Sequence, residues 1–379
     1  MAIQLAFEAL QKTARPENVN SIIELLRMTT AMDEEMLNTA ACDLINVQNG
    51  MLDWHTGKLL PHDPNYLSTF QLQLDYDPKA KSKVLEKFIA DVVPEDTRLL
   101  VEEMIGYLLL PSTKYQKAFM LVGQGRNGKS TFLNMLSTFF GKDVVARVSL
   151  HDLNDDKFAA SGLQGKLLNI FDDLPSTRME NTSAFKIITS GNAMMAQHKF
   201  GHPFVLKTTV RLIFSANEFP RSSNLDNAYF SRWLIIPFPN KFIDKTDDRQ
   251  LGTKLQSIEV KQAILNMAIR GLQRLEKNEG FSLSQSTLEQ EEKYKIESDS
   301  SYAFIKERLI NTQDNFIQKI EIYAEYTKWC LGSGIKFPAN QSKFNKSLVS
   351  LGYLEHQKGE QRTRCWAAKW ASNPPPATY

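Results

Sequence analysis

Cysteine is scarce in this chain, and the few cysteines present are widely spaced. The 379 residues contain three, Cys42, Cys330 and Cys365, and none of them belongs to a Cys-x-x-Cys pair. This spacing excludes a disulfide-framework protein and a zinc site with four cysteine ligands. It also favours a reducing compartment, so the sequence predicts a cytoplasmic location.

Long apolar runs and a strong net charge are also missing. No stretch approaches the roughly 18 uncharged apolar residues of a transmembrane helix, and the N-terminal apolar run is too short for a signal peptide. The sequence therefore predicts no membrane partner. Forty-five Lys and Arg against 43 Asp and Glu give a net charge of +2, which excludes nucleic-acid binding by bulk charge alone. Any such contact must be local.

The remaining composition is that of a folded globular protein, with 42% hydrophobic and 23% charged residues. The length suffices for two or three domains, and no internal repeat is present. The pattern predicts an N-terminal accessory domain of helices and hairpins at 1–95, an α/β core at 96–245, a helical segment and linker at 246–298, a C-terminal domain at 299–372 and a flexible tail at 373–379.

Four short apolar runs alternate with helical stretches in the central part of the chain. This alternation predicts parallel strands in an α/β core. The four predicted strands are Lys117–Val122, Leu167–Phe171, Val210–Ser215 and Leu234–Phe238.

A glycine-rich segment lies between the first of these strands and a predicted helix. Its sequence, GQGRNGKS, fits the pattern G-x-x-x-x-G-K-S/T without a mismatch. Glycines let backbone N–H groups face phosphates, the helix N-terminus adds partial positive charge, and Lys129 reaches the β and γ phosphates. Ser130 is expected to ligate Mg²⁺. The predicted ATP-binding residues are Gly123, Gln124, Gly125, Arg126, Asn127, Gly128, Lys129, Ser130 and Thr131.

The next two strands end in polar residues suited to ATP hydrolysis. Asp172 and Asp173 follow LLNIF; the first carboxylate is expected to hold Mg²⁺ and the second to polarise the attacking water. Asn217 follows RLIFSA, and its side chain is expected between the γ-phosphate and that water. Taken alone, such residues are ordinary turn features, so both assignments depend on the upstream glycine-rich segment.

Two basic positions complete the candidate set. Arg232 precedes the fourth strand; an arginine there is most often a surface residue, but phosphoryl transfer uses an arginine finger that a neighbouring subunit can supply. The segment AMMAQHKFGHPFVLK predicts a hairpin whose tip carries His198, Lys199 and Phe200. There lysine can meet phosphate while the aromatic ring stacks on a base. An ordinary solvated hairpin fits this segment equally well.

Together, these motifs resemble those of the superfamily 3 helicases of small viruses, phages and plasmids. The chain is most similar to the helicase part of the phage and plasmid primase-helicases, which are related to the poxvirus primase-helicase NTPase. The resemblance covers roughly residues 40–280 and implies an AAA+-like P-loop core. It implies that residues 123–130 are Walker A, that Asp172 and Asp173 are Walker B, and that Asn217 is the sensor.

The same resemblance implies a motor and its partners. Arg232 would be the arginine finger of a hexameric ring, and Lys199 would lie on the hairpin that enters the ring pore. Relatives translocate 3′ to 5′ on single-stranded DNA and act at replication forks in phage or mobile-element replication, so the host would be bacterial. No primase domain precedes the motifs, so we expect either part of a longer primase-helicase or a helicase that never carried a primase.

The C-terminal domain is similar to the winged-helix domains that lie at the C-terminus of related proteins. Its pattern predicts two helices followed by two strands joined by a turn. Between 328 and 369 it carries eight Lys and Arg against two Glu. The predicted duplex contacts are Lys343 and Lys346 on a helix and Arg362 and Arg364 on the wing. The alternative is a protein-docking module with a solvated basic face.

The sequence thus predicts an ATP-dependent DNA helicase whose catalytic residues are Lys129, Asp172, Asp173, Asn217 and Arg232. One alternative is a nucleotide-gated, origin-binding initiator without processive unwinding, although such a switch can dispense with the paired acids. Another is a small-molecule kinase, which would leave the hairpin and the basic C-terminal domain without a role.

Overall fold

The computed structural model describes residues 16–29, 36–38, 42–179, 181–222, 226–242, 250–359 and 362–371. The predicted tail at 373–379 lies outside them. The chain divides into two compact units, residues 1–71 and 72–379. Each is described by itself.

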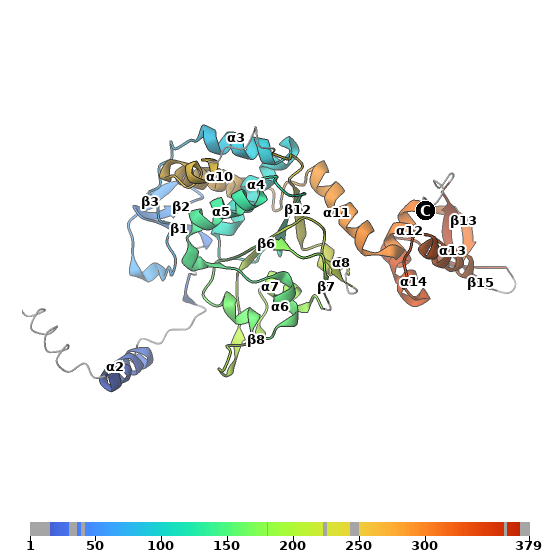
Figure 1. The fold of residues 1–379 in the computed structure, drawn as a ribbon, viewed down its shortest axis with the longest axis horizontal. Coiled ribbons are helices and arrows are strands. Elements are labelled where there is room, and N and C mark those ends of the chain that lie inside the picture. The colour runs from blue at the N-terminus through green and yellow to red at the C-terminus, as the bar shows by residue number, and fades with distance from the viewer. Residues whose placement is uncertain are drawn as a thin grey trace, which may run out of the picture. The chain divides into compact units, whose positions relative to one another are not determined.

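The first unit contains a helix and a small antiparallel sheet (Figure 1). Trp54 is 3% exposed, and its indole N–H donates to Cys42 O at 2.9 Å. Hairpins were predicted in this part of the chain, and the sheet consists of two of them. Its elements are α2 (Pro16–Thr29), β1 (Leu44–Val47), β2 (Gly50–Asp53), β3 (Lys58–Leu60) and the 3₁₀ turn η3 (Pro64–Tyr66).

A five-stranded sheet forms the centre of the second unit, in the order β12-β4-β10-β6-β5. Every neighbouring pair is parallel, as the alternation of strands and helices predicts. Its three interior strands are buried along most of their length, as expected for a parallel sheet that is covered on both faces. The strands are β4 (Ala118–Val122), β5 (Val145–Ala146), β6 (Leu168–Leu174), β10 (Arg211–Ala216) and β12 (Trp233–Pro237).

Helices and short strands surround this sheet. The helix that follows β4 begins directly at Lys129, after Gly128. The helices are α3 (Lys83–Val92), α4 (Arg98–Leu109), α5 (Lys129–Phe140), α6 (Leu150–Asp155), α7 (Ser183–Thr189), α8 (Asn227–Phe230), α9 (Leu251–Lys254), α10 (Ile258–Lys277) and α11 (Gln285–Ser298). The short strands are β7 (Arg178–Met179), β8 (Met194–Gln197), β9 (Pro203–Leu206) and β11 (Arg221–Ser222).

The C-terminal elements enclose a hydrophobic core of their own, which includes Phe304, Tyr326, Phe344 and Trp366. The predicted order of two helices and two strands is present, but β13 was not predicted. It forms an antiparallel sheet in the order β13-β15-β14. The elements are α12 (Ser300–Arg308), β13 (Leu309–Gln318), α13 (Lys319–Gly332), α14 (Gln341–Ser350), β14 (Glu355–Lys358) and β15 (Thr363–Trp370).

The division between the units falls earlier than the boundary expected at residue 95. Residues 72–95 belong to the second unit. They include α3, whose apolar face packs in that unit: Phe88 lies 6.5 Å from Phe132 of α5, measured between ring centroids. The sequence shows that α3 is amphipathic, but it does not show which element covers its apolar face.

No helix among the described residues is long and apolar enough to cross a membrane.

Helices α4 and α10 lie side by side (Figure 1), and glycine allows their close approach. A Cβ at Gly106 would lie 2.4 Å from Ala268 O, and one at Gly271 would lie 2.2 Å from Glu102 O. Real Cβ atoms do not approach backbone this closely, so each glycine makes room for the other helix.

We therefore expect Gly271→Ala to lower the free energy of unfolding by about 1–3 kcal/mol, because overpacking against backbone outweighs the better helix propensity of alanine. Urea denaturation followed by circular dichroism measures this. Gly252→Ala is the matched control: it lies in α9 with no atom within 4 Å of its Cβ position, and we expect no loss. Equal stabilities for the two variants would contradict the packing argument.

Candidate nucleotide site at the edge of the parallel sheet

The predicted ATP-binding and acidic residues meet at the carboxyl-terminal ends of the strands in the parallel sheet. Parallel strands end on the same side, and β4, β10 and β6 are neighbours, so the segments that follow them converge there. They enclose a cavity of about 420 Å³. It is lined by Gly125, Arg126, Asn127, Gly128, Lys129, Ser130, Thr131, Asp172, Asp173, Ser215 and Asn217.

The loop between β4 and α5 needs glycine at two places. Gly128 has φ +88°, in the left-handed region that only glycine adopts at low cost. A Cβ at Gly123 would lie 2.1 Å from the Asn127 amide nitrogen and 2.3 Å from Phe238 O. Neither Gly123 nor Gln124 lines the cavity; Gly123 instead makes room for the side chain of Asn127.

Asn127 links this loop to two other segments. Its Nδ2 donates to Phe238 O, just after β12, at 3.0 Å, and its Oδ1 accepts from Lys129 Nζ at 3.1 Å. Asn127 is only 3% exposed, so both contacts are shielded from water. The side chain therefore fixes the loop relative to the end of β12.

Lys129 is the most buried cation of the cavity, with 5% of its surface exposed. Its ammonium group donates to Gly123 O, to Asn127 Oδ1 and, at 3.0 Å, to Asn217 Oδ1. Burial lowers the pKa of Lys129, and the carboxylates of Asp172 and Asp173 oppose this change. The side chain is thus a buried positive charge held beside two acids, which is suited to bind an anion that enters the cavity.

The two acids occupy an irregularity in β6. Pairing with β10 is regular up to Phe171, then shifts so that Ala216 faces Leu174. Asp172 and Asp173 on β6 therefore stand opposite Ser215 alone, as in a β-bulge. Asp173 has φ +60°, a left-handed conformation that is uncommon for a residue other than glycine.

Ser215 holds this bulge and was not predicted as a site residue. Its hydroxyl donates to Asp172 Oδ1 and accepts from the Asp173 backbone N–H at 2.9 Å. Ser215 is fully buried. Its only sequence signal, a serine within an apolar strand, is not specific enough to identify this role.

Asn217 connects the acids to the lysine. Its Nδ2 donates to Asp173 Oδ1 at 3.0 Å, while its Oδ1 accepts from Lys129. Asp173 lies near the end of β6, Asn217 directly follows β10, and Lys129 begins the helix after β4. The three strands are neighbours in the sheet. The geometry brings together the predicted Lys129, Ser130, Asp172, Asp173 and Asn217, all of which line the cavity.

Arg232 does not line this cavity. Its guanidinium donates to Ala228 O and, at 2.9 Å, to Ser190 Oγ of the same chain. The side chain is half-buried between α8 and the residue that follows α7. In a single chain it therefore binds locally, and a finger role requires a neighbouring subunit.

The predicted hairpin is formed by β8 and β9, and the predicted residues at its tip lie in different environments. His198 stacks on Phe204 with ring centroids 5.0 Å apart, and its Nε2 lies 3.1 Å from Gln164 Oε1. Phe200 is 96% exposed, with the Lys199 ammonium 5.5 Å from its ring centroid. Lys199 and Phe200 are therefore available to a ligand, whereas His198 is engaged with its own chain.

The four predicted contacts of the C-terminal elements are all exposed. Lys343 and Lys346 lie on α14, and Arg364 lies on β15. Arg362, with φ +49°, lies just before β15. Trp366 is 1% exposed, so it belongs to the core of these elements.

Among the described residues, no group of three or more His, Cys, Asp or Glu side chains is arranged to hold a metal ion. A cation in the cavity would therefore be coordinated by hydroxyl and carboxylate oxygens of the protein together with oxygens of a bound molecule.

Two family models match parts of the sequence. Residues 4–94 match a model described as D5 N terminal like, and residues 121–232 match a family of unknown function, DUF5906. The second match contains the loop, both acids and Asn217.

Among curated proteins, the chain is similar to two viral proteins that are provisionally named helicases. It is 24% identical over 216 residues to L207/L206 of Acanthamoeba polyphaga mimivirus, covering 54% of this chain and 22% of that protein. It is 23% identical over 332 residues to 121R of Invertebrate iridescent virus 3, covering 76% of this chain and 35% of that protein. The chain thus spans about a fifth to a third of these relatives.

Among solved structures, the fold is similar to the apo C-terminal region of NrS-1, with a TM-score of 0.51, 9% identity and coverage of 92% of this chain and 90% of that one. This likeness concerns the fold alone. Together, the sequence matches relate the chain to a D5-like family model and to viral proteins that are named as helicases.

Proposed function

We propose that this chain is an ATP-dependent DNA helicase of superfamily 3, with an AAA+-like P-loop core and a C-terminal winged-helix domain. The observation that carries the proposal is the chain of contacts from Lys129 through Asn217 to Asp173. It joins a phosphate-binding cation to a carboxylate that can act on water, across three strand ends. A site that only binds phosphate has no need of the last two members.

In this proposal ATP fills the cavity with its phosphates on the loop. Backbone N–H groups of residues 125–131 and the N-terminus of α5 face the phosphates, and Lys129 exchanges some of its present contacts for phosphate oxygens. Ser130 and Asp172 would hold Mg²⁺, since hydroxyl and carboxylate oxygens are its preferred protein ligands. The ion would supply charge neutralisation at the β and γ phosphates.

The remaining polar groups act on the attacking water. Asp173 is placed to accept its proton or to orient it, and Asn217 lies between that carboxylate and the lysine. Ser215 keeps Asp172 and Asp173 pointing into the cavity through the bulge. Positioning and electrostatic stabilisation account for most catalysis of phosphoryl transfer, so these contacts are the catalytic machinery.

The active assembly in this proposal is a hexameric ring that moves 3′ to 5′ on single-stranded DNA at replication forks. Arg232 would leave Ser190 and reach the ATP of the adjacent subunit. Lys199 and Phe200 would contact the strand in the pore, with His198 supporting the tip. The C-terminal cations would contact the fork duplex. A primase, as a further domain or a partner, would act with it in the cytoplasm of a phage or plasmid host.

We expect single-stranded DNA to stimulate ATP hydrolysis by the wild-type chain, and Lys129→Ala to abolish the turnover because the phosphates lose their buried cation. Steady-state phosphate release with and without DNA measures this, followed by unwinding of forks that carry only a 3′ or only a 5′ tail. Lys142→Ala, exposed and outside the cavity, is the control. Turnover indifferent to DNA would favour a kinase or a nucleotide-gated initiator, and unwinding only from a 5′ tail would contradict the polarity.

We expect Ser215→Ala to lower the free energy of unfolding by about 0.5–1.5 kcal/mol, because the hydrogen bonds of the Ser215 hydroxyl with the Asp173 N–H and the Asp172 carboxylate are lost. Turnover should also fall roughly 10- to 100-fold, since an outer-shell partner of the Mg²⁺ ligand is lost. Ser130→Ala provides the contrast: Ser130 is exposed, so stability should stay unchanged while turnover is lost. Unchanged stability and turnover in Ser215→Ala would remove its assigned role.

We expect Arg232→Ala to assemble and bind ATP but to lose hydrolysis, because the finger acts across the subunit interface. Mixing it with Lys129→Ala should restore part of the turnover, since mixed rings contain interfaces with both an intact loop and an intact arginine. Size-exclusion chromatography and phosphate release measure both effects. Full turnover by Arg232→Ala alone would show that the residue has only its local structural contacts.

A further inference from the structure

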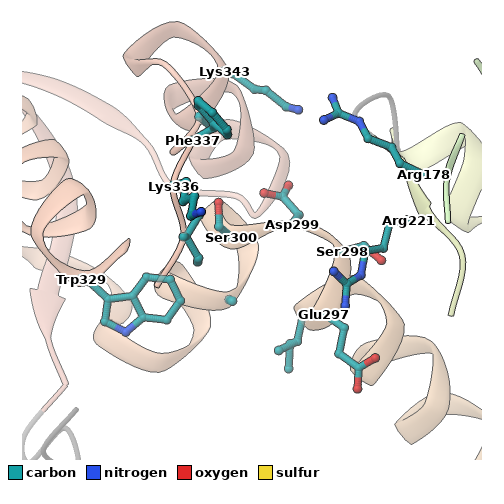
Figure 2. Close-up of a pocket in the computed structure, with 14 residues that line it drawn as sticks. Arg178, Arg221, Glu297, Ser298, Asp299, Ser300, Trp329, Lys336, Phe337 and Lys343 are labelled. Carbon is teal, nitrogen blue, oxygen red and sulfur yellow. The ribbon is translucent and has the colours of Figure 1, made fainter. Parts of the chain in front are cut away.

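A second cleft, of about 520 Å³, lies between β7, β11 and the C-terminal end of α11 on one wall and α12 to α14 on the other. It is separate from the nucleotide cavity and shares no lining residue with it. Figure 2 shows side chains from both walls directed into it, with Lys343 extending toward Arg178. All of its lining residues belong to the second compact unit.

Most of the charged residues that line the cleft are cations. Four basic side chains, Arg178, Arg221, Lys336 and Lys343, outnumber the acidic pair Glu297 and Asp299. Both acids interact elsewhere. Glu297 pairs with Lys293 at 3.7 Å, and Asp299 caps α12 by accepting from the N–H groups of Ser301 and Tyr302. Four positive against two negative side chains leave the lining with a formal net charge of +2.

The two arginines stand next to each other by strand pairing. Arg221 of β11 is the direct partner of Arg178 of β7 in a parallel two-stranded sheet, and both are exposed. Figure 2 shows their guanidinium groups pointing apart, that of Arg178 toward Lys343 and that of Arg221 toward the end of α11. Each arginine can therefore contact a different phosphate of one strand.

An aromatic ring stands beside these cations. Phe337, between α13 and α14, is 90% exposed although it is fully apolar, and Figure 2 places it near Lys336 and Lys343. A large apolar side chain gains nothing from such exposure in the free protein. Cations that follow a phosphate backbone, together with an aromatic ring on which a base can stack, are the two features of single-strand recognition.

We propose that this cleft binds a segment of single-stranded DNA, with phosphates on Arg178 and Arg221, further phosphate contacts from Lys336 and Lys343, and one base stacked on Phe337. The inference rests on the proposed helicase function and adds to it a second strand-binding surface outside the ring pore. It assigns Arg178 and Arg221 of the α/β core, rather than the C-terminal basic face alone, to DNA binding.

The test measures the affinity of the full-length chain for fluorescein-labelled oligothymidylate by anisotropy, over a range of salt concentrations and without nucleotide. We expect the double variant Arg178→Ala/Arg221→Ala to bind roughly tenfold more weakly. The slope of log affinity against log salt should shrink by roughly 1.4, since each lost phosphate contact on a single strand contributes about 0.7.

Phe337→Ala should weaken binding by a similar factor and leave the salt slope unchanged, because stacking releases no counterions. Phe337→Trp should restore the affinity. The double variant Lys142→Ala/Lys277→Ala is the matched control: it removes two exposed lysines outside the cleft, and its affinity and slope should equal those of the wild type. Thermal unfolding of each variant checks the fold.

An affinity and salt slope of the arginine variant equal to those of the control would overturn the proposal. So would displacement of the oligonucleotide by polyglutamate of equal charge as effectively as by unlabelled oligothymidylate, which would identify an acidic protein partner instead. DNA-independent ATP turnover combined with lost binding in the cleft variants would defeat the helicase function and leave the cleft assignment standing. Stimulated turnover with unaffected variants would do the reverse.

Discussion

The candidate site depends on the placement of β10 between β4 and β6 in a wholly parallel sheet. This arrangement places the carboxyl-terminal ends of the three strands side by side. Lys129, Asn217 and Asp173 can then form a continuous chain of contacts, although 88 residues separate the lysine from the asparagine. If β10 were an edge strand, it would not adjoin both β4 and β6, and Asn217 could not contact both Lys129 and Asp173.

The irregularity in β6 adds a second constraint. In a regular strand, Asp172 and Asp173 would point to opposite faces of the sheet, and only one could reach the cavity. The bulge opposite Ser215 and the left-handed backbone of Asp173 direct both carboxylates into it. The strain of that conformation is offset because Ser215 accepts from the Asp173 N–H and donates to Asp172. Two acids that are adjacent in sequence thus acquire different environments, which suits the two roles that we propose for them.

The sequence predicts the parts of this arrangement that have local signatures. The glycine-rich loop, the paired acids, the polar strand end at Asn217 and the parallel core are all recognisable from pattern and spacing. Ser215 is not, because a serine inside a strand has no distinctive spacing and its role arises only from the register between β10 and β6. The contact of Arg232 with Ser190, the pairing of Arg178 with Arg221 and the placement of α3 in the second unit depend likewise on contacts between distant segments.

One buried cluster joins the nucleotide site to the helix that leads to the C-terminal elements. Tyr294 of α11 donates to Pro220 O at 2.8 Å, contacts the hydroxyl of Tyr229 at 3.0 Å and stacks on Phe219. Burial raises the pKa of both tyrosines, so loss of a proton from either hydroxyl is disfavoured further. Phe219 and Pro220 directly follow the Asn217–Glu218 pair, and Tyr229 belongs to α8, whose Ala228 O holds Arg232. Packed and hydrogen-bonded neighbours thus connect Asn217 and Arg232 to α11, and the C-terminal end of this helix lines the cleft of the further inference.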